Sequence, residues 1–350
     1  MDVVVVTWDA LAASAIGCYG NEWVETPTLD GLAAAGVVLD RLLATHPATD
    51  LPPWPPIPVS FTAVCEGPAP AWLSEIAPGG AEQVEGETGP TAAPASTGVA
   101  RLLQAGVKAL QNRADGIPLR LWLHGQGVDC PCEPPAGFAT LYTEECDERG
   151  LPAPDLESED WRLHPAVYAG AVSLLDHWLG TLVAALRATA GQRPTILIVT
   201  ALRGVAWRTL ARREGSAELM EAHVPGLIYP FGNVPGWKEL SGERLRRPAA
   251  LSDLSATLAE ACSGVETPGS WLKQVALPHQ SSEVVVRTKA GSALLWNSDW
   301  LAIQPAGPDQ PLQLFQQPDD AGAVNDLAAQ RPEVAERLSE RLRPNSARSE

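Results

Sequence analysis

A basic stretch without acidic residues could hold an anion. Arg203, Arg208, Arg212 and Arg213 follow one another with no acidic residue between 203 and 213. A guanidinium keeps its charge and can bind two oxygens of a carboxylate, sulfate or phosphate at once. Arg203, where the run begins, is therefore a candidate anion-binding residue. A solvated basic loop is the alternative interpretation.

Side chains of the types that bind zinc lie in the middle of the chain. They are His124, Cys130, Cys132 and Cys146, although a C-x-C spacing is not that of the usual zinc knuckle. The six cysteines are too scattered for a disulfide scaffold in 350 residues, so reduced thiols in loops are the simpler interpretation. His124 follows a strand-like segment, from which it could contact an anion or play a structural role.

Asp9 directly follows the β-branched run Val3–Thr7 and Trp8. Such a run is typical of a parallel strand buried on both faces. Open α/β sheets bind their ligands at the carboxyl ends of these strands, so Asp9 is a candidate ligand residue. Capping of the following segment is the other interpretation.

The elements that must position these residues form an alternating pattern. Leu119–Leu123, Thr195–Thr200 and Val224–Tyr229 repeat the strand-like character, and helical stretches separate them. The clearest helix spans 165–189, with apolar residues at intervals of three and four and a proline in its first turn. We therefore predict an α/β fold with a doubly wound, mostly parallel sheet flanked by helices, in which Val3–Thr7 is central and lies beside Thr195–Thr200.

Two stretches do not resemble regular structure. Residues 52–97 contain ten prolines, and residues 133–160 contain nine acidic residues and one basic residue, Arg149. We expect a Pro-rich surface excursion and an acidic surface loop, respectively.

The last part of the chain differs in texture. Short strand candidates at 284–288, 293–296 and 300–304 predict an antiparallel meander, and Pro332 opens a helix. The predicted organisation is an α/β domain over 1–280 and a small antiparallel subdomain with a helix over 281–350.

Charge and composition exclude several classes of function. The chain has 25 Lys and Arg against 42 Asp and Glu, a net charge of −17, which would repel nucleic-acid phosphates and anionic lipids. No continuous apolar run approaches the ~18 residues of a membrane span, and no signal peptide opens the chain. We expect a cytoplasmic protein with no nucleic-acid or membrane partner.

Several ordered motifs resemble the sulfatases of the alkaline phosphatase superfamily. They are residues 3–11 (VVVVTWDAL), 17–20 (GCYG) and 26–37 (TPTLDGLAAAGV). Segments further along are also similar to the family: 168–176 (YAGAVSLLD), 195–200, 223–228 (HVPGLI), 252–258 (SDLSATL), and 314–316 with 325–328. The resemblance implies the family's fold and its site for hydrolysing sulfate or phosphate esters.

The resemblance also implies roles for particular residues. Asp9 stands where the family has its first metal-binding aspartate, and Ala10 replaces the second carboxylate of the pair. Thr49 occupies the position of the nucleophile, but Asp50–Pro53 lacks the arginine of the family's C/S-x-P-x-R motif. A threonine can serve as nucleophile in phosphodiesterase relatives, and an ordinary loop threonine is the alternative.

The strongest departure follows Thr195–Thr200. The resembled family has T-S-D-H-G there, whereas this chain has Leu202 and Arg203 at the positions of the Asp and the His. Leu202 supplies no ligand atom, and Arg203 places a cation in the space of the metal. Asp129 stands where the family has an active-site histidine, with His124 nearby. One aspartate cannot build a calcium site, which needs about six to eight oxygen ligands.

Three functions remain open. The first is a sulfatase-like pseudoenzyme that has lost ester hydrolysis, has no metal cofactor, and binds a small anionic ligand through Arg203 and His124. The second is an active hydrolase with Thr49 as nucleophile, which would need a divalent metal such as calcium or magnesium, held in part by Asp9. The third is an interaction or structural protein that uses the acidic loop 133–160 and exposed tryptophans.

Overall fold

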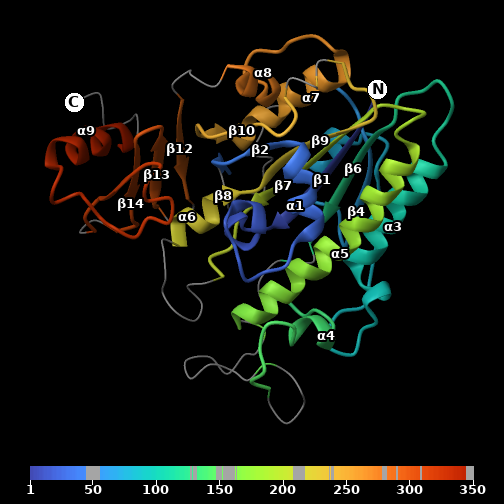
Figure 1. Cartoon of the computed structure of the whole chain (residues 1–350), viewed down its shortest axis with the longest axis horizontal. Coiled ribbons are helices and arrows are strands. Elements are labelled where there is room, and N and C mark those ends of the chain that lie inside the picture. The colour runs from blue at the N-terminus through green and yellow to red at the C-terminus, as the bar shows by residue number, and fades with distance from the viewer. Residues whose placement is uncertain are drawn as a thin grey trace.

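The protein combines one large sheet with a smaller one beside it (Figure 1). The computed structural model describes residues 1–44, 56–126, 128, 132–146, 152, 162, 164–207, 217–235, 237, 240–277, 282–288, 291–307 and 310–343. Within these ranges the chain forms an eight-stranded sheet, a three-stranded sheet and a four-stranded sheet.

The eight-stranded sheet has the order β10-β2-β9-β7-β1-β6-β4-β5. β1 is parallel to β6 and β7, β4 is parallel to β5 and β6, and β9 is antiparallel to β7 and β2. The mostly parallel sheet predicted from the sequence is therefore confirmed. The bounds are β1 Asp2–Ala10, β2 Val37–Leu39, β4 Thr62–Glu66, β5 Ala81–Val84, β6 Arg120–Gly125, β7 Thr195–Arg203, β9 Gly226–Phe231 and β10 Arg244–Leu245.

β1 is the central strand, as the run of valines predicts. Val3, Val4, Val5 and Val6 have no exposed surface, because helices cover both faces of the sheet. Its predicted neighbour at 195–200 is β7, and Val3 to Thr7 pair with Ile196 to Thr200 in register.

Helices form a layer on each side of this sheet (Figure 1). α5 (Pro165–Thr189) contacts α1 (Pro27–Ala35) and α3 (Gly98–Gln111) on one side, and α7 (Leu254–Ser263) and α8 (Trp271–Ala276) lie on the other. Shorter helices are α2 (Leu73–Ile76), α4 (Ala136–Ala139) and α6 (Ala217–Ala222).

α5 has the bounds that the sequence predicts, beginning at Pro165 and ending at Thr189. Among the described residues it is the helix with the length and apolarity to cross a membrane, but 67% of its most apolar window is buried inside the protein. The apolar side chains of α5 therefore pack in the core between α1, α3 and the sheet.

Two sequence-based expectations need correction. The Pro-rich stretch 52–97 is not a simple excursion, because β4 and β5 within it complete one side of the large sheet. The predicted strand at 224–229 is broken at Pro225, which has no N–H to donate. β8 (His223–Val224) joins a three-stranded sheet with β3 (Leu42–Leu43) and β11 (Ala249–Ala250), and β9 runs antiparallel to β7.

The C-terminal part forms the predicted antiparallel sheet and helix. Its strands are β12 (Glu283–Arg287), β13 (Ala293–Asn297), β14 (Trp300–Gln304) and β15 (Gln313–Gln316), of which the sequence did not indicate the fourth. One face packs on Leu43, Leu219 and Ala222 of the α/β part. The other face is covered by α9 (Pro332–Leu342) through Leu338 and Leu342. The domain division at 280 and 281 stays a prediction.

The acidic segment 133–160 lies partly within the described residues. α4 begins shortly after Glu133, and Glu133 pairs with Arg162 at 2.9 Å. Residues 147–151 and 153–160, which contain most of its acidic side chains, lie outside the described part of the chain.

Candidate functional site

The carboxyl ends of β1 and β7 lie side by side. Trp8 pairs with Ala201 and Ala10 pairs with Arg203, and the N–H of Leu11 donates to the carbonyl of Arg203 at 2.9 Å. The two segments that the sequence assigned to one site, 9–10 and 202–203, are therefore neighbours at one edge of the sheet.

The chemistry of this edge does not fit a divalent metal. Asp9 offers a carboxylate, whereas Ala10 and Leu202 have no ligand atoms and Arg203 carries a positive charge. Within the described ranges, no group of three or more His, Cys, Asp or Glu side chains is placed to hold a metal ion. A hard cation such as calcium needs several oxygen ligands, which these four positions do not supply.

Asp9 and Arg203 have different electrostatic surroundings. Alternation along a strand places Asp9 on the face of Thr7, and the register places Arg203 on the opposite face with Ala10. Burial raises the pKa of the Cys65 thiol to about 12, with smaller contributions from the negative charges of Glu66 and Asp9. The charge of Asp9 therefore acts on a residue of β4. Burial also raises the pKa of Glu221, an effect that the positive charge of Arg203 opposes.

His124 lies behind this edge rather than in it. The ring is 1% exposed, and its Nδ1 is 3.0 Å from the hydroxyl oxygen of Thr7. The same hydroxyl accepts a hydrogen bond from Trp122 Nε1 at 2.9 Å, and the edge of the Trp72 ring packs against the imidazole at 5.0 Å between centroids. The cluster of Thr7, Trp122, His124 and Trp72 is a buried polar network inside the sheet.

Burial lowers the pKa of His124 to about 4, with the bond to Thr7 opposing the shift. The imidazole is therefore neutral at pH 7, and both burial and neutrality argue against direct capture of an anion. The anion-binding roles of His124 and Arg203 stay predictions. Zinc binding by His124 has no support in the described residues either, because its Nδ1 faces Thr7 and no group of three or more His, Cys, Asp or Glu side chains there could hold a metal ion.

Several candidate residues fall outside the described part of the chain. Thr49 and Asp50–Pro53 lie in 45–55, Asp129 lies in 129–131, and Arg208, Arg212 and Arg213 lie in 208–216. Thr49 as a nucleophile therefore stays a prediction.

Most of the tryptophans in the described part of the chain are core residues, contrary to the idea of an exposed aromatic surface. Trp8, Trp122, Trp207, Trp271 and Trp296 are among the largest fully buried side chains. Among the described tryptophans, Trp23 is the one with a large exposed fraction, 42%, and it stacks on Trp207.

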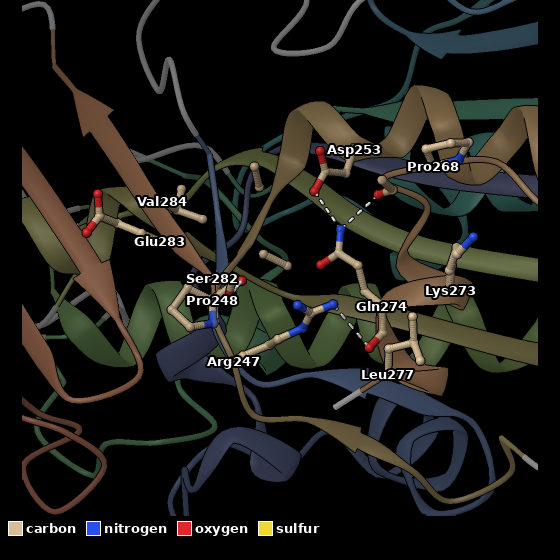
Figure 2. Close-up of a pocket in the computed structure, with 13 residues that line it drawn as sticks. Arg247, Pro248, Asp253, Pro268, Lys273, Gln274, Leu277, Ser282, Glu283 and Val284 are labelled. Carbon is tan, nitrogen blue, oxygen red and sulfur yellow. Dashed lines mark hydrogen bonds between the residues drawn. The ribbon is translucent and has the colours of Figure 1, made fainter. Parts of the chain in front are cut away.

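A polar pocket lies between α7, α8 and the beginning of β12 (Figure 2). The amide nitrogen of Gln274 donates to Asp253 and to the carbonyl of Gly269, both at 2.8 Å, and Arg247 donates to the carbonyl of Gln274 at 3.2 Å. These bonds fix α8 against α7, and none of Asp9, His124 and Arg203 lines this pocket.

A larger cavity lies between the α/β part and the C-terminal sheet, with a volume of ≈ 1310 Å³. Arg41, Arg244, His223 and Trp296 line it. The sequence analysis missed this site, because Arg41 and Trp296 are isolated residues in unremarkable segments. The pairing of Asp40 and Arg41 at the end of an apolar run was the only local signal.

The comparisons with known proteins found similarity in structure. No protein-family model matches it, and no curated protein sequence is similar to it. The phosphonate monoester hydrolase of Agrobacterium radiobacter superimposes with a TM-score of 0.69 and 14% identity, over 97% of this chain and 94% of that chain. The corresponding enzyme of Silicibacter pomeroyi gives 0.63 and 17%, over 97% and 94%. A 2-O GAG sulfatase gives 0.64 and 14%, over 97% and 90%.

These similarities establish the fold. The chain has the fold of the sulfatases and phosphonate monoester hydrolases to which it is similar. Identities of this size carry no activity to the chain.

Proposed function

We propose that the protein is a sulfatase-like pseudoenzyme, which keeps the fold and has lost ester hydrolysis. The observation that supports this is the register of β1 and β7, which brings Ala10 beside Arg203 at the end of the sheet. The resemblance to sulfatases implies that carboxylates belong at 10 and 202. Both positions carry aliphatic side chains, so the loss affects two strands that meet at one site.

The physical argument concerns charge. Transfer of a sulfuryl or phosphoryl group requires stabilisation of the charge that develops in the transition state, and a metal ion with its carboxylate ligands is one means to supply it. Asp9 is the one carboxylate among positions 9, 10, 202 and 203, and these positions offer little affinity for such a metal. An alcohol such as Thr49, without a metal or a strong base, is a weak nucleophile.

Arg203 gives the proposed pseudoenzyme a possible ligand interaction. Its guanidinium can bind an oxyanion at the edge where the metal would have been, without any metal ion. The nearby negative charge of Glu221 competes for this guanidinium, so anion binding through Arg203 is expected to be weak.

The test is an activity assay with aryl sulfates, aryl phosphates and phenyl phosphonates at neutral pH, each with calcium, magnesium or EDTA. We expect no turnover above that of an Asp9→Ala variant purified in parallel. Metal-dependent turnover that disappears in both Asp9→Ala and Thr49→Ala, while both variants remain folded by circular dichroism, would establish the hydrolase alternative. Turnover that neither substitution changes would indicate a contaminating enzyme, which chromatography to constant specific activity would remove.

A further inference from the structure

The cavity between the α/β part and the C-terminal sheet contains a buried positive charge. Arg41 lies in the turn between β2 and β3, is 8% exposed, and lines the cavity. Its guanidinium lies over the Trp296 ring at 5.4 Å, and one of its N–H groups donates to the carbonyl of Asn297 at the long distance of 3.5 Å.

No carboxylate in the described part of the chain forms an ion pair with Arg41. The adjacent Asp40 pairs with Arg244 at 2.5 Å, and Arg244 also donates to the carbonyl of Cys18. Burial lowers the pKa of Arg41, and Asp40 opposes this shift, but a guanidinium remains charged at any physiological pH. A buried cation with one weak acceptor is costly, and a bound anion would offset that cost.

The Trp296 ring beneath Arg41 belongs to a group of packed aromatic residues. The His223 ring packs edge-on against Trp296 at 5.6 Å and against Tyr19 at 5.7 Å, and its Nε2 is 2.9 Å from the carbonyl of Asp40. Burial lowers the pKa of His223 to about 4, so the ring is neutral and does not compete with Arg41 for an anion. His223 therefore supports the Trp296 ring, over which the guanidinium lies.

The remaining lining restricts the kind of anion. Phe315 and Met220 supply apolar wall, which suits an organic body rather than a bare inorganic ion. Asp326 also lines the cavity, but its carboxylate accepts from the N–H groups of Leu314 and Ala328. Glu218 adds a negative charge to the wall and disfavours ligands with more than one negative charge.

We propose that this cavity is a binding site for a small organic monoanion, with a carboxylate or sulfate group on Arg41 and its apolar body against Phe315 and Met220. The site is separate from the edge formed by Asp9 and Arg203, because neither residue lines the cavity. The inference does not depend on whether the protein hydrolyses esters.

The experiment is isothermal titration calorimetry with benzoate, phenyl sulfate, phenyl phosphate and inorganic sulfate as probes. We expect benzoate or phenyl sulfate to bind with a Kd below about 1 mM, and the dianion phenyl phosphate to bind more weakly. Arg41→Gln should weaken binding by about 10–100-fold, the effect of removing a charged hydrogen-bonding partner. Arg203→Gln and the surface variant Arg101→Gln on α3, neither of which changes a residue that lines the cavity, should leave the affinity within about 2-fold.

Several results would overturn the proposal. They are the absence of binding by every organic probe, unchanged affinity in Arg41→Gln, and inorganic sulfate that binds as tightly as phenyl sulfate. Loss of binding in Arg203→Gln alone would move the anion to the strand edge and support the role of Arg203 instead. If Arg41→Gln fails to fold, Arg41→Lys keeps the charge without the planar fork and should still weaken binding several-fold. A crystal of wild-type protein with 4-bromobenzoate would then locate the bromine by anomalous scattering, either beside Arg41 or elsewhere.

Discussion

Asp176 in α5 binds the beginning of α1 through Leu29. Its carboxylate accepts hydrogen bonds from the backbone N–H of Leu29 at 2.8 Å and from that of Thr28 at 2.9 Å. These N–H groups have no partner within their own helix, and the positive end of the helix dipole favours the negative charge. Two motifs far apart in the sequence, TPTLDGLAAAGV and YAGAVSLLD, are thus parts of one contact.

Asp176→Ala is expected to lower the free energy of unfolding by about 1–3 kcal/mol, because the buried N–H of Leu29 and the partly buried N–H of Thr28 lose their acceptor. Urea unfolding followed by circular dichroism would measure this. His177→Ala, at the adjacent exposed position of the same helix, is the matched control and should cost less than about 0.5 kcal/mol. Equal effects of the two substitutions would show that the cap contributes nothing beyond the loss of a side chain.

The buried histidine His124 predicts a loss of stability in mild acid. Its pKa is about 4 in the folded protein, below the ordinary value of 6.5, so between these values the unfolded chain binds more protons than the folded one. The stabilisation is therefore complete above pH 6.5 and decreases as the pH falls toward 4. The expected loss from this residue is roughly 3 kcal/mol.

Urea unfolding at pH 7.5, 6, 5 and 4 would check this contribution. His124→Gln cannot gain the proton, so its stability should fall less steeply than that of the wild type over this range. His177→Gln, an exposed histidine on α5, should follow the wild type. Parallel curves for wild type and His124→Gln would mean that the imidazole is protonated without penalty.

Purified protein is expected to contain no stoichiometric calcium, magnesium or zinc bound at Asp9. The reason is that positions 9, 10, 202 and 203, at the ends of β1 and β7, offer one carboxylate, that of Asp9, together with the cation Arg203. Elemental analysis after dialysis would measure the metal content, with Asp115→Ala as a surface control. About one metal per chain that is lost in Asp9→Ala, but kept in Asp115→Ala, would contradict the expectation.

Leu338→Ala should destabilise the C-terminal sheet by about 2–5 kcal/mol. Leu338 is 2% exposed and packs in the small core formed by α9 and the outer face of the sheet. Thermal unfolding would measure the effect, and Glu336→Ala on the exposed side of α9 is the control. If the wild type unfolds in two transitions and Leu338→Ala changes only one of them, residues 281–350 unfold on their own. That result would support the predicted domain division.

The sequence predicted the elements whose pattern is local. The run of valines predicts the strand β1, and Pro165 predicts the beginning of α5. Each signal lies within a few residues, and the structure has both elements where expected. β4 and β5 were missed because they are short and partly exposed, and prolines on either side make the segment look irregular. The antiparallel direction of β9 depends on the path of the chain after β7, which no local pattern encodes.

The same distinction applies to the candidate sites. Asp9 could be found because a carboxylate at a strand end is a local feature with a known place in the fold. Arg41 could not be found, because its significance depends on Trp296, which is brought to it by the docking of a separate sheet. His124 has the right residue type and the right position near a strand end, but its side chain points to Thr7.

The anion cavity has a consequence for how the protein is made. Every strand of the eight-stranded sheet lies before residue 246, whereas Trp296 and Phe315 follow it. Ribosomes release the N-terminal residues first, and early segments can fold before later ones exist. The large sheet can therefore form on a nascent chain in which Arg41 still faces water. The pocket comes into being only with the last strands, and a chain truncated before Trp296 would keep the sulfatase-like core without this binding site.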